Sequence, residues 1–249
     1  MGCFDGTAGP NRISTGSTSR RVRTRRHGFP RLKSHLPSHL AVHFAVMSPA
    51  RKIPVLGLVG GVGSGKSSVA AILSEAGCLV ADSDQLVRKA YEAPDVRAEL
   101  QTWWGPGILN EAGDVDRAAV AAVVFRDPVE RRRLEALIHP KVEAARRALF
   151  AAASPDTRAL VIDAPLLLEA GLAGECSEIW FVDAPETARR ARVMSGRGWS
   201  AEELDRREAA QWSLDRKRAA AHHVLRNDGD PASLREQVLR ALGNLPRTR

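Results

Sequence analysis

The fold of this chain is decided by one glycine-rich stretch, Val55-Leu56-Gly57-Leu58-Val59-Gly60-Gly61-Val62-Gly63-Ser64-Gly65-Lys66-Ser67-Ser68. Within it, Gly60, four further residues and Gly65-Lys66-Ser67 satisfy the phosphate-binding pattern G-x-x-x-x-G-K-[ST] at every position. Glycine has no Cβ, so consecutive backbone N–H groups can turn toward one anion, and the helix that follows directs its positive end at the same point. An apolar run over 53–59 and a helical pattern over 66–76 flank the loop, so a strand, a loop and a helix are expected in that order.

Two side chains of this loop suit a nucleotide. Lys66 is placed to reach the β- and γ-phosphates, and the Ser67 hydroxyl is placed to bind Mg²⁺. The simpler alternative is a glycine-rich turn that binds nothing. A complete match between a strand and a helix favours nucleotide binding over that alternative.

Beyond the loop, short apolar runs alternate with amphipathic helical patterns, which is typical of a parallel sheet covered by helices. We predict an α/β fold with a doubly wound, five-stranded parallel sheet of the P-loop NTPase type. The expected strands are 53–59, 78–82, 158–163, 178–183 and 222–226. The expected helices are 66–76, 84–92, 117–125, 128–152, 185–195, 200–211, 213–221 and 231–242.

The interval between the second and third strands is too long for one crossover helix. It predicts an inserted helical subdomain over 84–152, of the kind that gives open α/β folds their substrate-specific structure. The core would then comprise 53–83, 153–184 and 222–243, with a helical lid over about 185–221.

The net charge of +8 is concentrated at the N-terminus. Residues 1–52 hold ten Lys and Arg residues against one acid, Asp5, so the remaining sequence is close to neutral. This basic extension is rich in Ser, Thr, Arg, Gly and Pro and has no sustained apolar periodicity, so we expect it to be disordered. It fits either an organellar targeting segment or a start codon assigned upstream of Met47, and the second interpretation is favoured.

The same observations argue against several kinds of partner. No apolar run reaches the roughly 18 residues that a membrane-spanning helix needs, so no membrane partner is expected. The positive charge lies outside the predicted folded part and no nucleic-acid-binding motif is present, so no nucleic-acid partner is expected. Cys3, Cys78 and Cys176 lack metal-ligand spacing and are interpreted as thiols in a reducing compartment. We therefore expect a cytoplasmic protein and favour a monomer.

Acidic residues follow the second and third predicted strands. Asp82 and Asp84 come where 78–82 ends, and open parallel sheets bind their ligands at this edge. Such carboxylates can hold Mg²⁺ through water or accept a proton from an attacking hydroxyl; the alternative is that one of them caps the next helix. Asp163 ends the third strand in the manner of a Walker-B aspartate, which binds Mg²⁺ or its water shell.

Basic residues flank this predicted site. Arg88 lies one turn after Asp84 and either steers an anionic substrate or is solvated. Three arginines lie near a glycine-flanked hinge, ahead of a capping box that opens at Ser200; they are Arg189, Arg192 and Arg197. Arginines of a mobile lid neutralise charge in the transition state of phosphoryl transfer, and the closed lid excludes water. The alternative is a solvated basic helix face.

Taken in order, these residues resemble those of dephospho-coenzyme A kinases. The resemblance rests on Gly57–Ser67, Asp82-Ser83-Asp84 with Arg88, His139-Pro140, Asp163-Ala164-Pro165-Leu166-Leu167-Leu168-Glu169, Arg192, Arg197, Gln211 and Asn227. It covers about 53–243, and its D-x-D, H-P and P-L-L-x-E elements are more specific than the phosphate-binding loop. It implies a kinase domain over 53–243 that uses ATP and Mg²⁺ to phosphorylate the 3′-hydroxyl of dephospho-CoA, the last step of coenzyme A synthesis.

The resemblance also implies roles for single residues. Asp84 looks like the general base, and Lys66, Arg192 and Arg197 look like the other catalytic residues. The acceptor substrate would be bound by Asp82, Arg88 and His139, and the metal by Ser67 and Asp163. ATP would be bound by Gly61, Val62, Gly63, Ser64, Gly65, Lys66, Ser67 and Ser68 and, near the adenine, by Asn227.

Two positions depart from the family pattern. Val59 stands where family members commonly have Thr, and Ser195-Gly196-Arg197-Gly198 lacks the Asp that often follows the lid arginine. Neither change removes a group that direct in-line transfer requires. Two alternatives stay open from the sequence: another P-loop kinase of a nucleoside or small molecule, and a non-catalytic P-loop nucleotide-binding protein.

Overall fold

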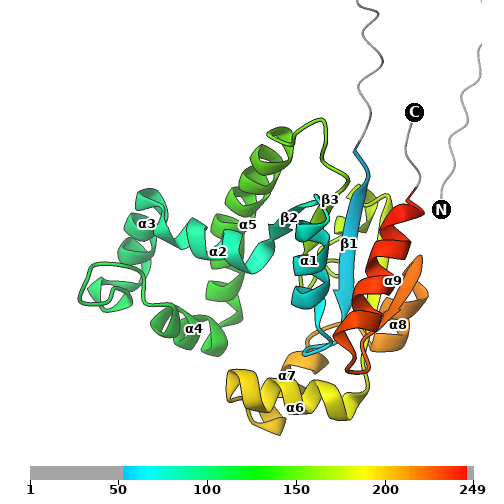
Figure 1. Cartoon of the computed structure of the whole chain (residues 1–249). Coiled ribbons are helices and arrows are strands. Elements are labelled where there is room, and N and C mark those ends of the chain that lie inside the picture. The colour runs from blue at the N-terminus through cyan, green and yellow to red at the C-terminus, as the bar shows by residue number, and fades with distance from the viewer. Residues whose placement is uncertain (1–52, 246–249) are drawn as a thin grey trace, which may run out of the picture. The chain divides into compact units, whose positions relative to one another are not determined.

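A computed structural model of the chain describes residues 53–245, apart from the side chain of Arg197. Within this range the chain forms a five-stranded sheet with the strand order β2-β3-β1-β4-β5, and every strand pair is parallel (Figure 1). The strands are β1 (Val55–Gly60), β2 (Leu79–Asp82), β3 (Leu160–Asp163), β4 (Glu178–Asp183) and β5 (His223–Arg226). The predicted α/β fold class is confirmed; the expectation for residues 1–52 lies outside the described residues.

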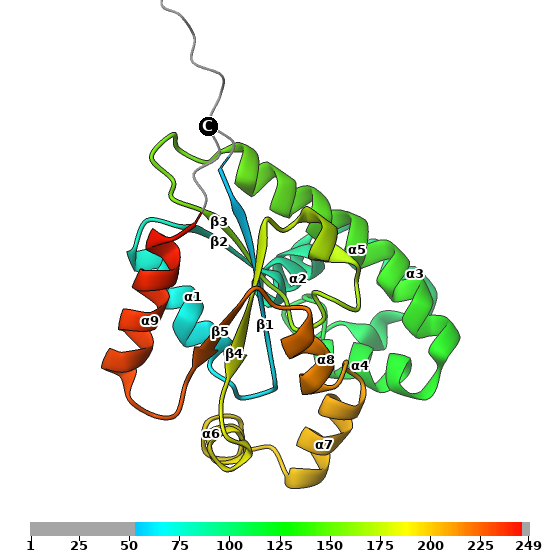
Figure 2. The ribbon, with the colours of Figure 1, turned by 90° about the vertical axis from the view of Figure 1, so that its right-hand side faces the viewer.

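Helices connect the strands and lie over both faces of the sheet (Figure 2). The α-helices are α1 (Lys66–Glu75), α2 (Ser83–Glu92), α3 (Pro94–Trp104), α4 (Arg117–Arg126), α5 (Pro128–Ala151), α6 (Glu186–Arg197), α7 (Ala201–Ala209), α8 (Leu214–Ala219) and α9 (Pro231–Gly243). Two short 3₁₀ helices are η1 (Pro106–Ile108) and η2 (Leu172–Glu175). Helices on both faces make the sheet doubly wound, as predicted.

Alternate residues of the strands serve two apolar cores. Leu56 and Leu58 of β1 lie in one buried cluster with Leu73 of α1 and Val238 of α9. Val59 points to the opposite face, because successive side chains of a strand alternate. The second cluster also contains Ile162, Leu167 and Phe181, with Phe150 and Trp212 packed against it. Burial on both faces explains why the strands are near-continuous apolar runs in the sequence.

The long interval between β2 and β3 contains the four helices α2 to α5, which we call the helical insertion (residues 83–151). The helical insertion packs its own apolar cluster, in which Val96, Leu100 and Val120 are buried. The predicted division of 53–243 into core, substrate subdomain and lid stays a prediction.

One helix of the insertion, α3, is absent from the predicted set. The Pro94 that begins it and the Gly105-Pro106-Gly107 turn that follows it suggest a connection when read in sequence. Proline at the first position of a helix costs no hydrogen bond, because that N–H has no partner within the helix. The spacing of Val96 and Leu100, both fully buried, is the signal that a helix was present.

The end of α6 also differs from the prediction. The helix predicted over 185–195 is longer at its C-terminus: α6 continues through Gly196 to Arg197 and ends at Gly198, which has a left-handed φ of 63°. The helix α7 then begins as predicted, since Ser200 accepts a hydrogen bond from the Glu203 N–H at 3.3 Å.

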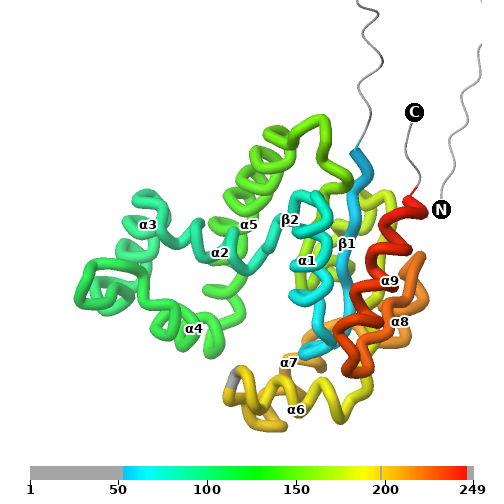
Figure 3. Tube along the Cα trace, viewed as in Figure 1, coloured from blue at the N-terminus to red at the C-terminus, as the bar shows by residue number. Residues whose placement is uncertain are grey.

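The parallel register brings several strand ends to one edge of the sheet. Asp82 of β2 lies beside Asp163 of β3, and Leu58 of β1 pairs with the same Asp163. Gly60 at the end of β1 pairs with Val182 of β4. The loop between β1 and α1 leaves the sheet at this edge, and α6 and α7 lie beside it (Figure 3).

The apolar cluster of the helical insertion should be sensitive to the loss of a buried side chain. Leu100→Ala removes a fully buried side chain and should lower the free energy of unfolding by about 2–5 kcal/mol. Leu239→Ala is the matched control on α9, because Leu239 is 36% exposed and its truncation should cost less than about 1 kcal/mol. Urea unfolding measures both variants. Equal losses would contradict a packed core in the insertion.

Candidate active site

A cavity of about 480 Å³ lies at the carboxyl edge of the sheet, within the size range of small-molecule sites. Its walls come from the loop after β1, the ends of β2 and β3, and the helices α6 and α7 with the residues next to them. The lining residues are Val62, Gly63, Ser64, Gly65, Lys66, Ser67, Asp82, Asp84, Asp163, Pro165, Leu166, Arg192, Val193, Trp199, Arg207, Ala210 and Gln211.

The phosphate-binding loop requires glycine at two of its positions. Gly63 has a φ of 75° and Gly65 a φ of 95°, a region that residues with a Cβ rarely adopt. A Cβ on Gly65 would lie 2.0 Å from the Asn227 Nδ2 atom, and one on Gly63 would lie 2.6 Å from the Arg189 carbonyl oxygen. The loop therefore approaches two distant segments as closely as bare backbone allows.

Lys66 folds back over the loop that precedes it. Its Nζ donates to the carbonyl oxygens of Gly60 at 3.2 Å and Gly61 at 3.1 Å. Ser67, the next residue, is exposed in the first turn of α1 and lines the same cavity. The ammonium group and the hydroxyl are thus presented together at the N-terminus of a helix, where an anion is stabilised.

Three carboxylates, those of Asp82, Asp84 and Asp163, line the cavity from β2, α2 and β3. Asp82 is the N-cap of α2, and its Oδ1 accepts a hydrogen bond from the Gln85 N–H at 3.0 Å. The alternative in which one acid caps the helix is therefore confirmed for Asp82. Asp84 lies in the first turn of α2, is exposed, and does not have this role.

The half-buried Asp163 is the carboxylate whose ionisation is most perturbed at this edge. Burial is the largest cause and raises the pKa of Asp163 to about 6; the Lys66 ammonium lowers this pKa, and the charges of Asp82 and Asp84 raise it. A carboxylate that is costly to ionise beside two others is stabilised when a cation binds among them.

Arg192 connects α6 to the phosphate-binding loop. Its guanidinium donates to Asn227 Oδ1 at 3.2 Å and to the Gly63 carbonyl oxygen at 3.4 Å. Asn227 is buried after β5, and its Nδ2 donates to the Ser64 carbonyl oxygen at 2.8 Å. Arg192 and Asn227 thus bind each other and two consecutive carbonyl oxygens of the loop.

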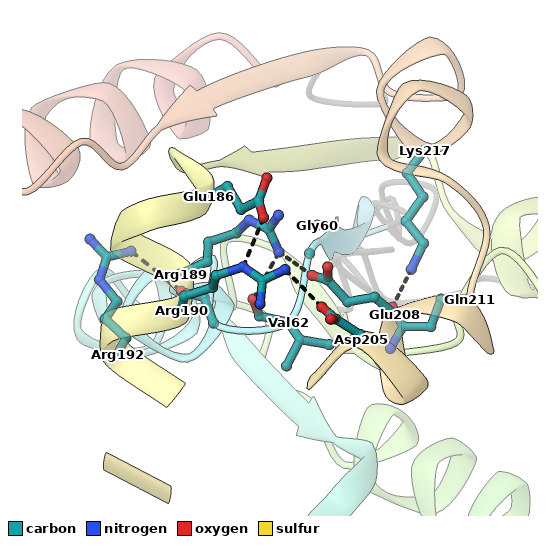
Figure 4. A network of polar contacts seen from close by, with 12 residues as sticks. Gly60, Val62, Glu186, Arg189, Arg190, Arg192, Asp205, Glu208, Gln211 and Lys217 are labelled. Carbon is teal, nitrogen blue, oxygen red and sulfur yellow. Dashed lines mark hydrogen bonds and ion pairs between the residues drawn. The ribbon is translucent and has the colours of Figure 1, made fainter. Parts of the chain in front are cut away.

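The two arginines that precede Arg192 in α6 have other partners (Figure 4). Arg189 is buried, donates to the Val62 carbonyl oxygen at 3.3 Å and forms an ion pair with Glu208 of α7. Arg190 bonds Glu186 and Asp205, each at 2.8 Å. Arg189 is therefore neither a solvated residue nor part of the cavity wall: it ties α6 to the loop and to α7.

The structure brings most of the predicted site residues together. The cavity is lined by Val62, Gly63, Ser64, Gly65, Lys66, Ser67, Asp82, Asp84, Asp163 and Arg192. Gly61, Ser68 and Asn227 belong to the loop or contact it without lining the cavity. Arg88 on α2 and His139 on α5 are exposed and lie outside the lining set. The side chain of Arg197 is outside the described residues.

Some lining residues received no role from the sequence. Trp199 and Arg207 form one wall, with the Arg207 guanidinium 4.0 Å from the centre of the Trp199 ring. Gln211 forms part of another, and it belonged to the family resemblance without an assigned function. Their positions in the cavity wall depend on how the segment from α6 to α8 packs against the loop. The spacing of residues in the sequence does not predict this packing.

A family comparison agrees with this geometry. The sequence profile of the family described as dephospho-CoA kinase matches residues 54–233 of this chain. The chain belongs to the dephospho-CoA kinase family. A dephospho-CoA kinase from Synechococcus sp. (strain CC9605) is 43% identical over 195 residues, which cover 77% of this chain and 93% of that relative. A kinase is a phosphotransferase, so the predicted class of enzyme is confirmed.

Solved structures share the fold of this dephospho-CoA kinase family member. The crystal structure of TT1252 from Thermus thermophilus is 36% identical, with a TM-score of 0.68 over 78% of this chain and 98% of that chain. A dephospho-CoA kinase from Campylobacter jejuni is 19% identical, with a TM-score of 0.52 over 76% of this chain and 95% of that chain, and supports the fold alone. The P-loop kinase fold is thereby confirmed.

The donor set of the cavity fits a nucleotide with Mg²⁺. Ser67, Asp163, Asp82 and Asp84 offer oxygen atoms, which are the ligands that Mg²⁺ prefers. The Ser64 hydroxyl in the loop is 1% exposed and has no hydrogen-bond partner among the described residues. No helix in the described part of the chain is long and apolar enough to cross a membrane.

The raised pKa of Asp163 predicts a pH-dependent stability. Because the native pKa of about 6 lies above the ordinary value of 3.8, ionisation of Asp163 destabilises the native state as the pH rises from 3.8 through 6. Asp163→Asn should therefore raise the free energy of unfolding at pH 8, by on the order of 2 kcal/mol, and have much less effect at pH 4. Urea unfolding of the nucleotide-free protein in a chelating buffer measures this difference.

Asp156→Asn is the control for this experiment, because Asp156 is exposed in a turn before β3. Its effect should be small and similar at both pH values. A gain from Asp163→Asn that is the same at pH 4 and pH 8 would show that the carboxylate is not costly to ionise.

Proposed function

We propose that this protein transfers the γ-phosphoryl group of ATP to the 3′-hydroxyl of the ribose of dephospho-CoA, giving CoA and ADP. The observation that supports this best is one cavity lined both by Lys66 and Ser67 of the glycine-rich loop and by the carboxylates of Asp84 and Asp163. The loop accounts for the phosphoryl donor, and the family accounts for the acceptor.

ATP is proposed to bind along the loop, with its β- and γ-phosphates at the N-terminus of α1. The proposed contacts are Gly61, Val62, Gly63, Ser64, Gly65, Lys66, Ser67 and Ser68, with Asn227 on the adenine side. Lys66 already lies against the loop through Gly60 and Gly61, so little reorganisation is needed to place its charge on the phosphates.

Mg²⁺ is proposed to be held by Ser67 and Asp163. When bound, the ion neutralises charge on the β- and γ-phosphate oxygens. Asp163 lies at the end of β3, in register with Leu58 of β1, so its place is set by the sheet rather than by a loop. The charge of the ion would also remove the cost of ionising this buried carboxylate.

Asp84 is proposed to act as the general base, with Lys66, Arg192 and Arg197 as the charge-stabilising catalytic residues. The 3′-oxygen attacks the γ-phosphorus, the bond from that phosphorus to the ADP oxygen breaks, and the hydroxyl proton passes to the Asp84 carboxylate. Asp84 suits this step because it is exposed to the cavity, whereas Asp82 is occupied as the cap of α2. Catalysis then consists mainly of positioning and electrostatic stabilisation.

The acceptor substrate is proposed to contact Asp82, Arg88 and His139. Arg88 follows Asp84 by one turn of α2, and His139 lies on α5, which packs against α2 in the helical insertion. Both side chains are exposed, so they are accessible to a substrate that extends from the cavity over the insertion. The enzyme is further proposed to act in the cytoplasm, as a monomer, without nucleic-acid or membrane partners.

Turnover of dephospho-CoA by the purified chain with ATP and Mg²⁺ tests the proposal. CoA and ADP should form in equal amounts, and a panel of nucleosides and small hydroxyl compounds should be poor acceptors. Phosphorylation of another acceptor in preference to dephospho-CoA would overturn the proposed substrate. Formation of no product from any acceptor would overturn catalysis.

Substitution of the two acids of the D-x-D element should change turnover to different extents. Asp84→Asn keeps the shape of the side chain but removes the proton acceptor, so turnover should fall by about 10²–10⁴-fold. ATP affinity, measured by titration calorimetry, should stay within about twofold, because Lys66, Ser67 and the loop amides are unchanged.

Asp82→Asn is the matched control for that variant. Asparagine keeps an oxygen that can accept from the Gln85 N–H, so the cap of α2 is preserved. Turnover should fall less than in Asp84→Asn. Near-normal turnover in Asp84→Asn together with an inactive Asp82→Asn would reverse the two roles.

A further inference from the structure

A lysine that contacts a residue of the cavity wall is fully buried. Lys217, on α8, is 0% exposed, although an ammonium ion is costly to bury unless it is paired and hydrogen-bonded. Its Nζ has three oxygen partners: Gln211 Oε1 at 2.7 Å, the Pro165 carbonyl oxygen at 3.3 Å and Glu169 Oε1 at 3.3 Å. An ammonium group has three N–H donors and no acceptor, so the number of oxygen partners equals the number of its donors.

This arrangement determines which end of the Gln211 amide is available to the cavity. Because Lys217 can only donate, the oxygen of the Gln211 amide must face it (Figure 4). The Nε2 group, with two N–H donors, has no hydrogen-bond partner among the described residues. Gln211 lines the cavity, so what it can present to a ligand there is a hydrogen-bond donor.

A second contact secures the same turn. The N–H of Trp212, the residue after Gln211, donates to Glu169 Oε1 at 2.7 Å. Burial alone raises the pKa of Glu169, but the hydrogen bond from Trp212 and the charge of Lys217 outweigh it, and the net pKa is lowered, so the carboxylate is ionised near neutral pH. The turn between α7 and α8 is therefore held at two points to the segment Pro165–Glu169 that follows β3.

The sheet order indicates which substrate this donor faces. The strand order β2-β3-β1-β4-β5 divides the cavity edge into two sides. Arg192 and Asn227, which contact the phosphate-binding loop, come from segments after β4 and β5. Gln211 is instead anchored to the segment after β3, next to Asp163 and on the side of Asp84. In the proposed function, this is the side of the attacking hydroxyl.

We propose that the Gln211 Nε2 group donates a hydrogen bond to an oxygen of the acceptor substrate, a ribose hydroxyl or a phosphate oxygen, and that Lys217 is the positioning residue that sets the orientation of this amide. The proposal rests on the proposed function, because it names the acceptor as the ligand. Neither residue takes part in proton transfer.

Gln211→Glu separates this role from a structural one. Glutamate keeps an oxygen for Lys217, so the buried ammonium remains satisfied, but it replaces the Nε2 donor with a second acceptor. The KM for dephospho-CoA should rise at least about tenfold, because a donor is lost and a negative charge faces the substrate oxygens. The KM for ATP should stay within about twofold, and the melting temperature should not fall.

Gln101→Glu is the matched control: it makes the same chemical change on the exposed face of α3, away from the cavity lining, and both KM values should be unchanged. Lys217→Met then tests positioning. It should raise the KM for dephospho-CoA in the wild-type background, and by a smaller factor in the Gln211→Glu background, where no donor is left to position. Equal factors would mean that Lys217 acts only through stability.

The outcomes distinguish this inference from the proposed function. If the wild-type protein does not turn over dephospho-CoA, the proposed function fails and the inference fails with it. If the wild-type protein is active and Gln211→Glu leaves both KM values within twofold, only the inference fails. A rise in the KM for ATP instead would show that the donor faces the nucleotide.

Discussion

Parallel pairing of β1 with β3 on one side and with β4 on the other is the constraint on which the site depends. The carboxyl ends of parallel strands meet at one edge, so the loop after β1 and the acids after β2 and β3 converge there although they lie far apart in sequence. Both faces of the sheet are covered by helices, which leaves this edge as the place where backbone groups and charges can meet a ligand. Asp163 lies at this edge because it is the last residue of β3, and Lys66 because it begins the helix after the loop that follows β1.

The loop itself is held by cations on its carbonyl side. The carbonyl oxygens of Gly60 and Gly61 accept from Lys66, that of Val62 accepts from Arg189, and that of Gly63 accepts from Arg192. These bonds place positive charge on the carbonyl side of the loop. The Gly61 carbonyl oxygen also accepts from the Ser64 N–H at 3.2 Å. Because Arg189 and Arg192 belong to α6, any movement of α6 changes the support of the loop.

Two ion pairs with a buried cation join segments next to the cavity. Arg189 pairs with Glu208 between α6 and α7, and Lys217 pairs with Glu169 between α8 and the segment after β3. The cost of desolvating such charges offsets much of their attraction, so their main effect is to select one geometry. In both cases that geometry concerns a residue at the site: the Val62 carbonyl of the loop in the first and the Gln211 amide in the second.

The sequence by itself determined the fold class, the strands and the position of the glycine-rich loop, because each depends on local spacing: alternating burial in strands, or eight consecutive positions in the loop. It also determined the family, through short elements such as Asp82-Ser83-Asp84. It missed α3, whose Pro94 resembles a break in the chain, and it ended the helix of 185–195 too early, since α6 continues to Arg197. Only the tertiary structure decided that Asp82 is a cap, that Arg189 is buried behind the loop, and that Lys217 orients Gln211. The physical reason is that burial and hydrogen-bond partners depend on contacts between segments distant in sequence, and local spacing does not report them.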